Sequence, residues 1–368
     1  MADPGFDYNE HPHRRYNPLT QRWLLCSPHR TKRPWQGGKE TVNEDRPYDP
    51  RNNLLPGAVR TSGEVNLEYE STFAFTNDFS ALLPDTPHGQ VGSVENNNLF
   101  IAEAVRGECR VLCFHPRHDL TIAEMTQEEI QAIVTLWTIH YEDLGSKPSI
   151  NYVQIFENKG AAMGCSNPHP HGQIWSGSFI PENSRVSLES QANYKKAKGI
   201  LLLQDYVEQE VEKKIRVIAQ NEYFVAVIPF WAAWPYEVMI MPAPGRHYKS
   251  LSDLDDAAKS GLADAMGRVT RRYDNLFECS FPYSMGIHQA PTDGKDYSFA
   301  QMHLLYYPCL LRSATVKKFM VGFEMLGEPQ RDLTAEQAAD KLNVVSDTEH
   351  YRKRLSKEEY EKKYLSNK

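Results

Sequence analysis

The 368-residue sequence lacks a long apolar run, a surplus of basic residues and closely paired cysteines. No stretch reaches the about 20 apolar residues that a membrane span needs, and the first residues lack the basic and apolar regions of a signal peptide. We therefore expect a cytoplasmic protein with no membrane partner. A formal net charge of −7 argues against a nucleic-acid partner. The six scattered cysteines argue against a disulfide framework or a zinc ribbon.

The sequence does have the means to bury a core, since 40% of its residues are hydrophobic. Its apolar periodicity predicts a strand over residues 110–114, then a helix, then a strand over 152–156. The helix begins with a capping box formed by Thr126 and Glu129, and Gly145 is suited to end it. Its apolar positions follow helical spacing: Ile130, Ile133, Val134, Trp137 and Leu144.

The second half of the sequence repeats this order of elements. Its helix opens near Ser252 and carries Asp255 in its first turn. Strands are predicted on both sides of that helix, over residues 224–228, 238–241, 283–287 and 302–307. The two halves match in the order of their elements rather than residue by residue. This order indicates an ancient duplication of one unit of two strands, a helix and two strands.

The polar stretch 181–198, rich in Glu, Ser, Asn, Gln and Lys, is the predicted joint between two domains. We place an N-terminal domain, which carries the candidate nucleophile, at residues 1–185. A C-terminal domain follows at 186–350. Residues 351–368 are dense in Lys, Arg and Glu, and we expect them to form a solvated helix or tail without a chemical role.

A polar loop followed by a strand pattern occupies residues 157–175. Backbone N–H groups of this Gly- and Ser-containing loop are suited to bind a phosphate. Side chains alternate along a strand, so His169, His171 and Gln173 are expected to share one face. A neutral imidazole is a competent nucleophile toward phosphorus, because no base has to remove a proton first. Its other ring N–H is expected to donate to a backbone carbonyl of the same loop.

The two histidines by themselves would leave several interpretations open. A His-x-His pair alone is more often a satisfied polar pair or a metal site than a nucleophile. Here Asn158, Gly164, Ser166 and Gln173 occur in the same loop and strand as the two histidines. Ser166 and Gln173 are suited to hold the non-bridging oxygens of a phosphate. This coincidence favours catalysis at the loop.

Residues 158–175, Asn-Lys-Gly-Ala-Ala-Met-Gly-Cys-Ser-Asn-Pro-His-Pro-His-Gly-Gln-Ile-Trp, resemble the active-site signature of the galactose-1-phosphate uridylyltransferases, the transferase branch of the histidine-triad superfamily. The resemblance runs nearly end to end, with matching segments at 13–19, 27–35, 75–79, 273–277 and 311–324. It implies an α+β fold: a histidine-triad-like fold duplicated in one chain, with an antiparallel sheet and flanking helices. It also implies a homodimer with composite active sites.

The resemblance implies a double displacement. The second histidine of His-Pro-His, His171, attacks the α-phosphorus of UDP-glucose and releases glucose 1-phosphate, and galactose 1-phosphate then collects the UMP as UDP-galactose. The implied catalytic set is His171, Gln173, Ser166 and His169. Residues implied to bind the nucleotide and its phosphates are Arg30, Arg33, Asn77, Asp78, Phe79, Asn158, Gly164 and Cys165. The hexose-binding segment, implied to reach the partner subunit's site, holds Lys318, Phe319, Val321, Phe323, Glu324 and Gln330, with Phe323 replacing the tyrosine of many members.

The sequence departs from the family at two metal sites. Bacterial-type members build a zinc site from two cysteines and two histidines, and the matching positions are Asn52, Leu55, His118 and His169. A second site of one glutamate and three histidines has its counterparts at Ser187, His288, His303 and Leu305. A register shift would be needed to bring Glu189 into the second site. We expect no tightly held structural zinc or iron, and the transfer itself requires no cofactor.

Two other functions share parts of this interpretation. A nucleotidyl transferase or phosphorylase that acts on ADP-sugars or dinucleoside polyphosphates would keep the histidine intermediate and change its partners. A binding or scaffold protein that had lost catalysis would keep only the fold. The presence of His171, Gln173 and Ser166 favours an enzyme, with galactose metabolism as its expected role.

Overall fold

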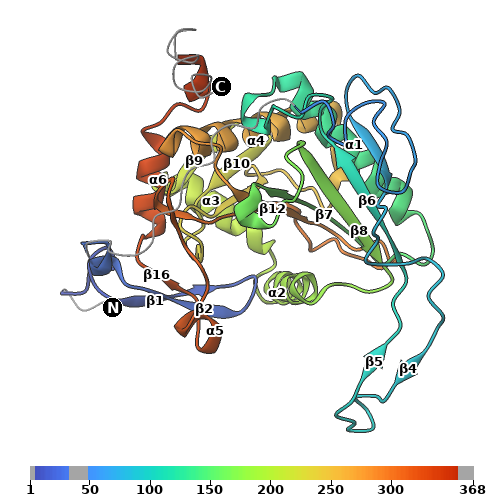
Figure 1. Cartoon of the computed structure of the whole chain (residues 1–368). Coiled ribbons are helices and arrows are strands. Elements are labelled where there is room, and N and C mark those ends of the chain that lie inside the picture. Colours follow the sequence, from blue (N-terminus) through green and yellow to red (C-terminus); the bar gives the residue numbers. More distant parts are fainter. Residues whose placement is uncertain (1–4, 33–48, 355–368) are drawn as a thin grey trace.

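The computed structural model describes residues 5–32 and 49–354, which build one large sheet flanked by helices (Figure 1). The sheet has nine strands, and every neighbouring pair is antiparallel. The predicted α+β fold with an antiparallel sheet is confirmed. Across the sheet the strands are β3 (Phe73–Thr76), β6 (Gly107–Cys113), β8 (His171–Gly177), β7 (Tyr152–Lys159), β12 (Tyr283–His288), β13 (His303–Pro308), β11 (Val238–Pro242), β10 (Phe224–Val227) and β9 (Val217–Gln220).

Each half of the chain contributes the same arrangement of four strands. From the outside inward, the N-terminal half gives β3, β6, β8 and β7, and the C-terminal half gives β10, β11, β13 and β12 inside the edge strand β9. A long helix separates the second strand from the third in each half: α1 (Gln127–Gly145) follows β6, and α4 (Asp256–Phe277) follows β11. The halves meet where β7 pairs with β12. The predicted duplication is therefore present in the topology of the sheet.

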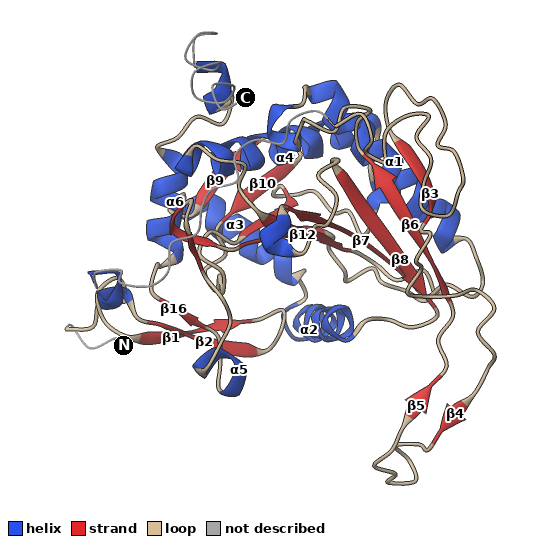
Figure 2. Ribbon diagram, viewed as in Figure 1, coloured by secondary structure: helices blue, strands red, loops and turns tan. Residues whose placement is uncertain are grey.

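The two faces of the sheet are covered differently. One face packs alternate side chains, among them Ile155, Ile174 and Ile287, against α1 and α4 in the main apolar core. The opposite face of β10, β11 and β13 packs on α3 (Leu202–Lys213) in a second apolar cluster. Figure 2 shows α2 (Glu182–Lys198) near the centre of the molecule, between the large sheet and the small sheet at the lower left. The candidate functional site lies on this second face of the sheet, among side chains of β7 and β8.

Smaller elements surround the large sheet. β1 (His13–Asn17) and β2 (Arg22–Cys26) pair with β16 (Gln330–Arg331), and β14 (Leu310–Ser313) pairs with β15 (Val316–Lys317). β4 (Gln90–Val91) and β5 (Ala102–Glu103) form a hairpin that projects from the body (Figure 1). The remaining helices are α5 (Phe323–Leu326), α6 (Ala335–Asn343) and the 3₁₀ helices η1 (Pro28–Lys32), η2 (Ile122–Glu124), η3 (Ala161–Met163), η4 (Leu251–Asp253) and η5 (Tyr351–Arg354).

Two further expectations concern membrane-spanning helices and the C-terminal tail. Among residues 5–32 and 49–354, no helix is both long and apolar enough to span a bilayer. The expected C-terminal tail begins with η5, and its residues 355–368 lie outside the described part of the chain. The domain limits at 185 and 350 stay predictions.

The predicted helices are present, with one wrong start. α1 has the predicted capping box of Thr126 and Glu129 and ends at Gly145, and its predicted apolar positions are buried. The start of α4 near Ser252 was wrong. Ser252 lies in η4, and the helix begins at Asp256 after the N-cap Asp255, whose side chain accepts a 2.7 Å hydrogen bond from the backbone N–H of Ala258. The polar stretch predicted as the joint forms α2 over most of its length.

A buried polar network ties β7 to the C-terminal half. Lys159 forms an ion pair with Asp274 of α4 at 2.8 Å, and Asp274 also contacts His350 at 3.1 Å. Nearby on β7, Glu157 accepts a 3.0 Å hydrogen bond from the hydroxyl of Tyr283. Burial disfavours the charged carboxylate and raises the pKa of Glu157 from 4.5 to about 7. Titration of Glu157 therefore makes the free energy of unfolding depend on pH.

Glu157→Gln is expected to make stability less dependent on pH. Between about pH 4.5 and pH 7 the folded wild type binds more protons at Glu157 than the unfolded chain does, so its free energy of unfolding falls as the pH rises. Glutamine removes this titration and still accepts from Tyr283. The loss of stability between pH 5 and pH 8 should shrink by about 2–3 kcal/mol in chemical denaturation. Exposed Glu142→Gln is the control, and an unchanged pH dependence in Glu157→Gln would contradict the buried titration.

Candidate active site

A polar pocket lies where β7 ends and β8 begins, on the face of the sheet that points away from the main core. The two strands are antiparallel neighbours, and their register sets Phe156 opposite Gln173. The connecting loop contributes its residues Gly164 to Ser166 to the wall. The described residues that line the pocket are Phe156, Asn158, Gly164, Cys165, Ser166, His171, Gly172 and Gln173. All of them except Phe156 and Gly172 were predicted from the sequence as site residues.

His171 is the first residue of β8, and its ring is partly exposed. Its Nδ1 atom lies 2.7 Å from the backbone carbonyl oxygen of His169. A carbonyl oxygen only accepts hydrogen bonds, so Nδ1 carries the ring proton and Nε2 keeps its lone pair. This is the contact that the sequence predicted for orienting the ring. It leaves Nε2 as the ring nitrogen that can act as a nucleophile.

Gly172 allows the strand to pack closely behind the pocket. A Cβ atom at this position would lie 2.8 Å from the ring of Phe114 and 2.9 Å from the backbone oxygen of Phe156. Both distances are shorter than a side-chain carbon tolerates. Any larger residue would therefore move β8, and with it the neighbouring His171 and Gln173. Close packing therefore explains why a glycine stands between His171 and Gln173.

The prediction that His169 shares the face of His171 was wrong. β8 begins only at His171, so strand alternation does not extend back to His169. The side chain of His169 is buried outside the pocket lining, with Nε2 3.1 Å from the hydroxyl of Tyr69. Burial lowers its pKa to about 3, which keeps the ring neutral. His169 contributes to the site through its backbone carbonyl.

The loop before β8 has a compact turn rather than an open ring of backbone donors. Gly160 and Gly164 adopt positive φ angles of 90° and 78°, which glycine tolerates. The backbone N–H groups of Met163 and Cys165 donate to the carbonyl of Gly160, and that of Gly164 donates to Ala161. These three N–H groups are therefore used inside the turn. The predicted phosphate contact stays a prediction for the other N–H groups of the loop, and side chains provide the polar wall.

Gln173 is oriented by two neighbours that the sequence did not identify as partners. Its Oε1 atom accepts hydrogen bonds from the indole Nε1 of Trp175 at 3.2 Å and from the amide of Asn77 at 3.4 Å. Because both contacts engage the oxygen, the Nε2 amide group is left as the donor toward the pocket. Asn77, predicted to bind nucleotide, thus reaches the site through Gln173.

Asn158 is oriented in the same way by the C-terminal half of the chain. Asn158 and Ser284 are directly opposed on β7 and β12, and the hydroxyl of Ser284 donates to Oδ1 of Asn158 at 2.7 Å. The amide nitrogen of Asn158 is then the free donor of the side chain. Sequence reasoning missed Ser284, since only the register of two distant strands brings it to the site.

These groups make a site suited to an oxyanion next to a nucleophile. The amides of Asn158 and Gln173 and the hydroxyl of Ser166 belong to residues that line the same pocket as His171. Fixed donors of this kind stabilise the charge that develops on the oxygens of a transferring phosphoryl group. No lysine or arginine lines the pocket among the residues that the structure describes. Positive charge for a diphosphate would have to come from outside this lining.

The other predicted nucleotide-binding residues lie outside the pocket lining. Asp78 pairs with Arg60 at 3.0 Å, and Arg60 stacks its guanidinium over Phe75. Phe79 is 76% exposed. Arg30 lies 3.5 Å from Asp332. Arg33 falls outside the described residues.

The predicted hexose-binding segment also stays out of the lining of the pocket. Lys318 and Glu324 pair with each other, and Gln330 is buried in β16, where it donates to Asp332 at 2.6 Å. The apolar members of the segment are at least half exposed: Phe319 (57%), Val321 (55%) and Phe323 (53%). In a single chain these three apolar side chains are largely open to solvent.

The positions of the family's zinc site are occupied by hydrogen-bonded and apolar side chains. The amide of Asn52 donates to Asn167 at 2.8 Å, and Leu55 is buried. Nε2 of His118 accepts from the backbone N–H of Asp49 at 2.5 Å, and Nε2 of His169 contacts Tyr69. Only the two imidazoles remain of the four ligand positions, and Asn52 and Leu55 provide no thiolate at the other two. The residues do not fit zinc.

Comparison with known proteins agrees with the geometry. Residues 5–181 and 187–355 match the family models described as galactose-1-phosphate uridyl transferase, N-terminal domain and C-terminal domain. Galactose-1-phosphate uridylyltransferase of Haemophilus influenzae is 50% identical over 351 residues, which cover 95% of this chain and 98% of the relative. The enzyme of Saccharomyces cerevisiae is 48% identical over 368 residues, which cover 96% and 100%.

Solved structures share the fold at lower identity. A uridylyltransferase structure is 24% identical with a TM-score of 0.71, covering 91% of this chain and 98% of the other. An ADP-glucose phosphorylase from Arabidopsis thaliana is 23% identical with a TM-score of 0.71, covering 91% and 100%. At these identities the structures establish the fold alone. The two family models together span most of the chain, and the chain belongs to the galactose-1-phosphate uridylyltransferase family.

Proposed function

We propose that this protein transfers UMP from UDP-glucose to galactose 1-phosphate through a covalent intermediate on His171. The observation that carries the proposal is the orientation of the His171 ring. Its Nδ1 proton is held by the carbonyl of His169, so Nε2 presents a lone pair inside a pocket of fixed donors. We also propose that the protein acts in galactose metabolism and is located in the cytoplasm.

The reaction proceeds in two displacements at the α-phosphorus. Nε2 of His171 forms a bond to phosphorus while the bond to the bridging oxygen breaks, and glucose 1-phosphate leaves with that oxygen. A phosphate oxygen of galactose 1-phosphate then attacks the same phosphorus, and the phosphorus–nitrogen bond breaks to give UDP-galactose. The amides of Gln173 and Asn158 donate to the non-bridging oxygens in both steps. No metal or cofactor is needed in either step.

We infer further that a second copy of this chain completes the site. The described lining of the pocket contains no cation, although a nucleoside diphosphate brings at least two negative charges. The segment with Lys318 exposes Phe319, Val321 and Phe323, which is the surface expected of a part that packs elsewhere. A homodimer with composite active sites would supply both a cation and cover for these side chains.

The first prediction concerns the half-reaction alone. Without galactose 1-phosphate, the wild type should exchange labelled glucose 1-phosphate into UDP-glucose, because the first displacement is reversible. His171→Ala should lose this exchange by more than about 10⁴-fold, on the scale seen when a covalent nucleophile is removed. Exchange is followed by scintillation counting after separation. ADP-glucose serves as the comparison substrate, and faster exchange with ADP-glucose would contradict the uridylyl assignment.

A second prediction tests the orientation of Asn158. Ser284→Ala frees the amide of Asn158 to rotate, and kcat/KM should fall about 3–10-fold, the equivalent of one hydrogen bond of about 1 kcal/mol. Ser284→Thr keeps the hydroxyl and should retain most of the activity. In an Asn158→Ala background, Ser284→Ala should have no further effect. An additive loss in that double variant would show that Ser284 does not act through Asn158.

A third prediction tests the composite site by mixing two inactive chains. His171→Ala and Lys318→Ala chains carry different affinity tags, and heterodimers are isolated from cells that express both. If Lys318 acts at the partner's site, each heterodimer has one intact site and should show about half of the wild-type activity per dimer. If both residues act within one chain, both sites are damaged and activity should stay at the level of the parent variants. A monomeric wild type in sedimentation would also contradict the proposal.

A further inference from the structure

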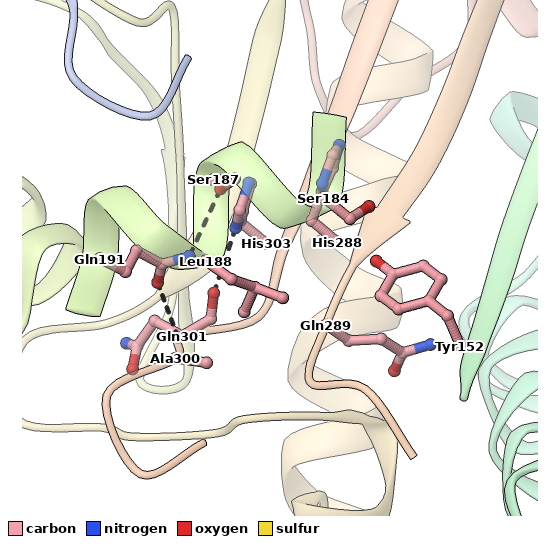
Figure 3. A pocket seen from close by; sticks show the side chains of 10 residues that line it. All are labelled: Tyr152, Ser184, Ser187, Leu188, Gln191, His288, Gln289, Ala300, Gln301 and His303. Atoms are coloured by element: carbon pink, nitrogen blue, oxygen red, sulfur yellow. Dashed lines mark hydrogen bonds between the residues drawn. The ribbon is translucent and has the colours of Figure 1, made fainter. Parts of the chain in front are cut away.

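A second polar cavity lies between α2 and the C-terminal half of the sheet (Figure 3). It shares no lining residue with the His171 pocket. Its volume is about 10 Å³, which is room for about one water molecule. The residues that line it are Tyr152, Ser184, Ser187, Leu188, Gln191, His288, Gln289, Ala300, Gln301 and His303.

The duplication of the sheet relates this cavity to the active site. His303 is the first residue of β13, as His171 is the first residue of β8, and these strands hold equivalent places in the two halves. Nδ1 of His303 lies 3.1 Å from the carbonyl of Gln301, two residues earlier, and Nδ1 of His171 makes the equivalent contact with the carbonyl of His169 at 2.7 Å. Both rings therefore keep the lone pair on Nε2. The second half has the same histidine arrangement without an open pocket.

Two side-chain atoms at the cavity need a partner. Nδ1 of His288 and Oε1 of Gln301 are buried and have no hydrogen-bond partner among the described residues. Gln301 is only 2% exposed. Burying such atoms unpaired is unfavourable, and native proteins commonly satisfy them with an ordered water. Figure 3 shows these two side chains on opposite sides of the pocket, so each would need a water of its own.

The residues do not fit the metal that the family resemblance implies at this place. Ser187 and Leu305 stand at two ligand positions, and Leu305 packs in the apolar cluster with α3. The rings of His288 and His303 are stacked, with centroids 5.0 Å apart and planes 4° from parallel. In-plane lone pairs of two stacked rings do not converge on one ion. Glu189 does not substitute, because it pairs with Arg185 on the exposed side of α2.

Gln191 makes the connection that a metal would otherwise make between α2 and the sheet. Its Oε1 atom accepts from the backbone N–H of Gln301 at 2.9 Å, and its Nε2 atom donates to Ser187 at 3.4 Å. Gln301 in turn donates through its side chain to the carbonyl of Arg246 at 3.0 Å. Figure 3 shows Gln191 reaching from α2 toward Gln301. One buried amide links the helix to the segment that leads into β13.

We propose that this chain fastens α2 to the sheet with a metal-free clasp, in which the buried side chain of Gln191 on α2 accepts from the backbone N–H of Gln301. The clasp lies beside His303, which is the counterpart of the proposed nucleophile His171 in the second half. The proposal does not depend on the transfer reaction.

The first test measures metal and stability in the full-length wild type, expressed with added zinc and iron. We expect less than about one ion per ten chains by elemental analysis, and a midpoint of thermal unfolding that EDTA shifts by less than about 1 °C. Metal that stays bound through gel filtration and disappears in His303→Gln would overturn the proposal. A midpoint that falls by several degrees in EDTA, in the wild type but not in His303→Gln, would overturn it as well.

The second test changes the clasp itself. Gln191→Leu should lower the midpoint by about 2–4 °C, with or without EDTA, whereas exposed Glu189→Ala should leave it within about 1 °C. An unchanged midpoint in Gln191→Leu would overturn the proposal.

Discussion

The hydrogen bond from Nδ1 of His171 to the carbonyl of His169 decides which ring nitrogen keeps the lone pair. It forms because β8 begins at His171, so that His169 lies before the strand and its carbonyl contacts the ring instead of a partner in the sheet. Pairing with β6 and β7 fixes the start of β8, and Gly172 lets it pack against Phe114. The large sheet thus sets the protonation pattern of its own nucleophile.

Hydrogen bonds to neighbouring residues also orient the two amides beside His171. Gln173 and Asn158 each have their oxygen engaged by a neighbour, so their nitrogens are available to a phosphate. One of these neighbours, Ser284, belongs to the C-terminal half. The duplicated half also repeats the arrangement of His171 at His303, but α2 covers that histidine. Duplication has therefore given one half the chemistry and the other half a supporting role.

Much of this architecture could be predicted where the signals are local. The capping box and apolar spacing define α1, and the loop with His171 and Gln173 identifies the site. The position of His169 could not be predicted, because it depends on the residue at which β8 begins. Ser284 reaches the site only through the register of β7 with β12. The start of α4 was misplaced since two capping signals follow each other closely, at Ser250 and at Asp255.

The central claim is that UMP is carried on Nε2 of His171. Mass spectrometry of the intact protein after incubation with UDP-glucose alone tests it directly. The account predicts a mass gain of one UMP group on the wild type, located on His171 by peptide mapping and removed by galactose 1-phosphate. His171→Ala should gain nothing. A stable adduct on another residue, or turnover of both substrates with no adduct at any time point, would contradict the account.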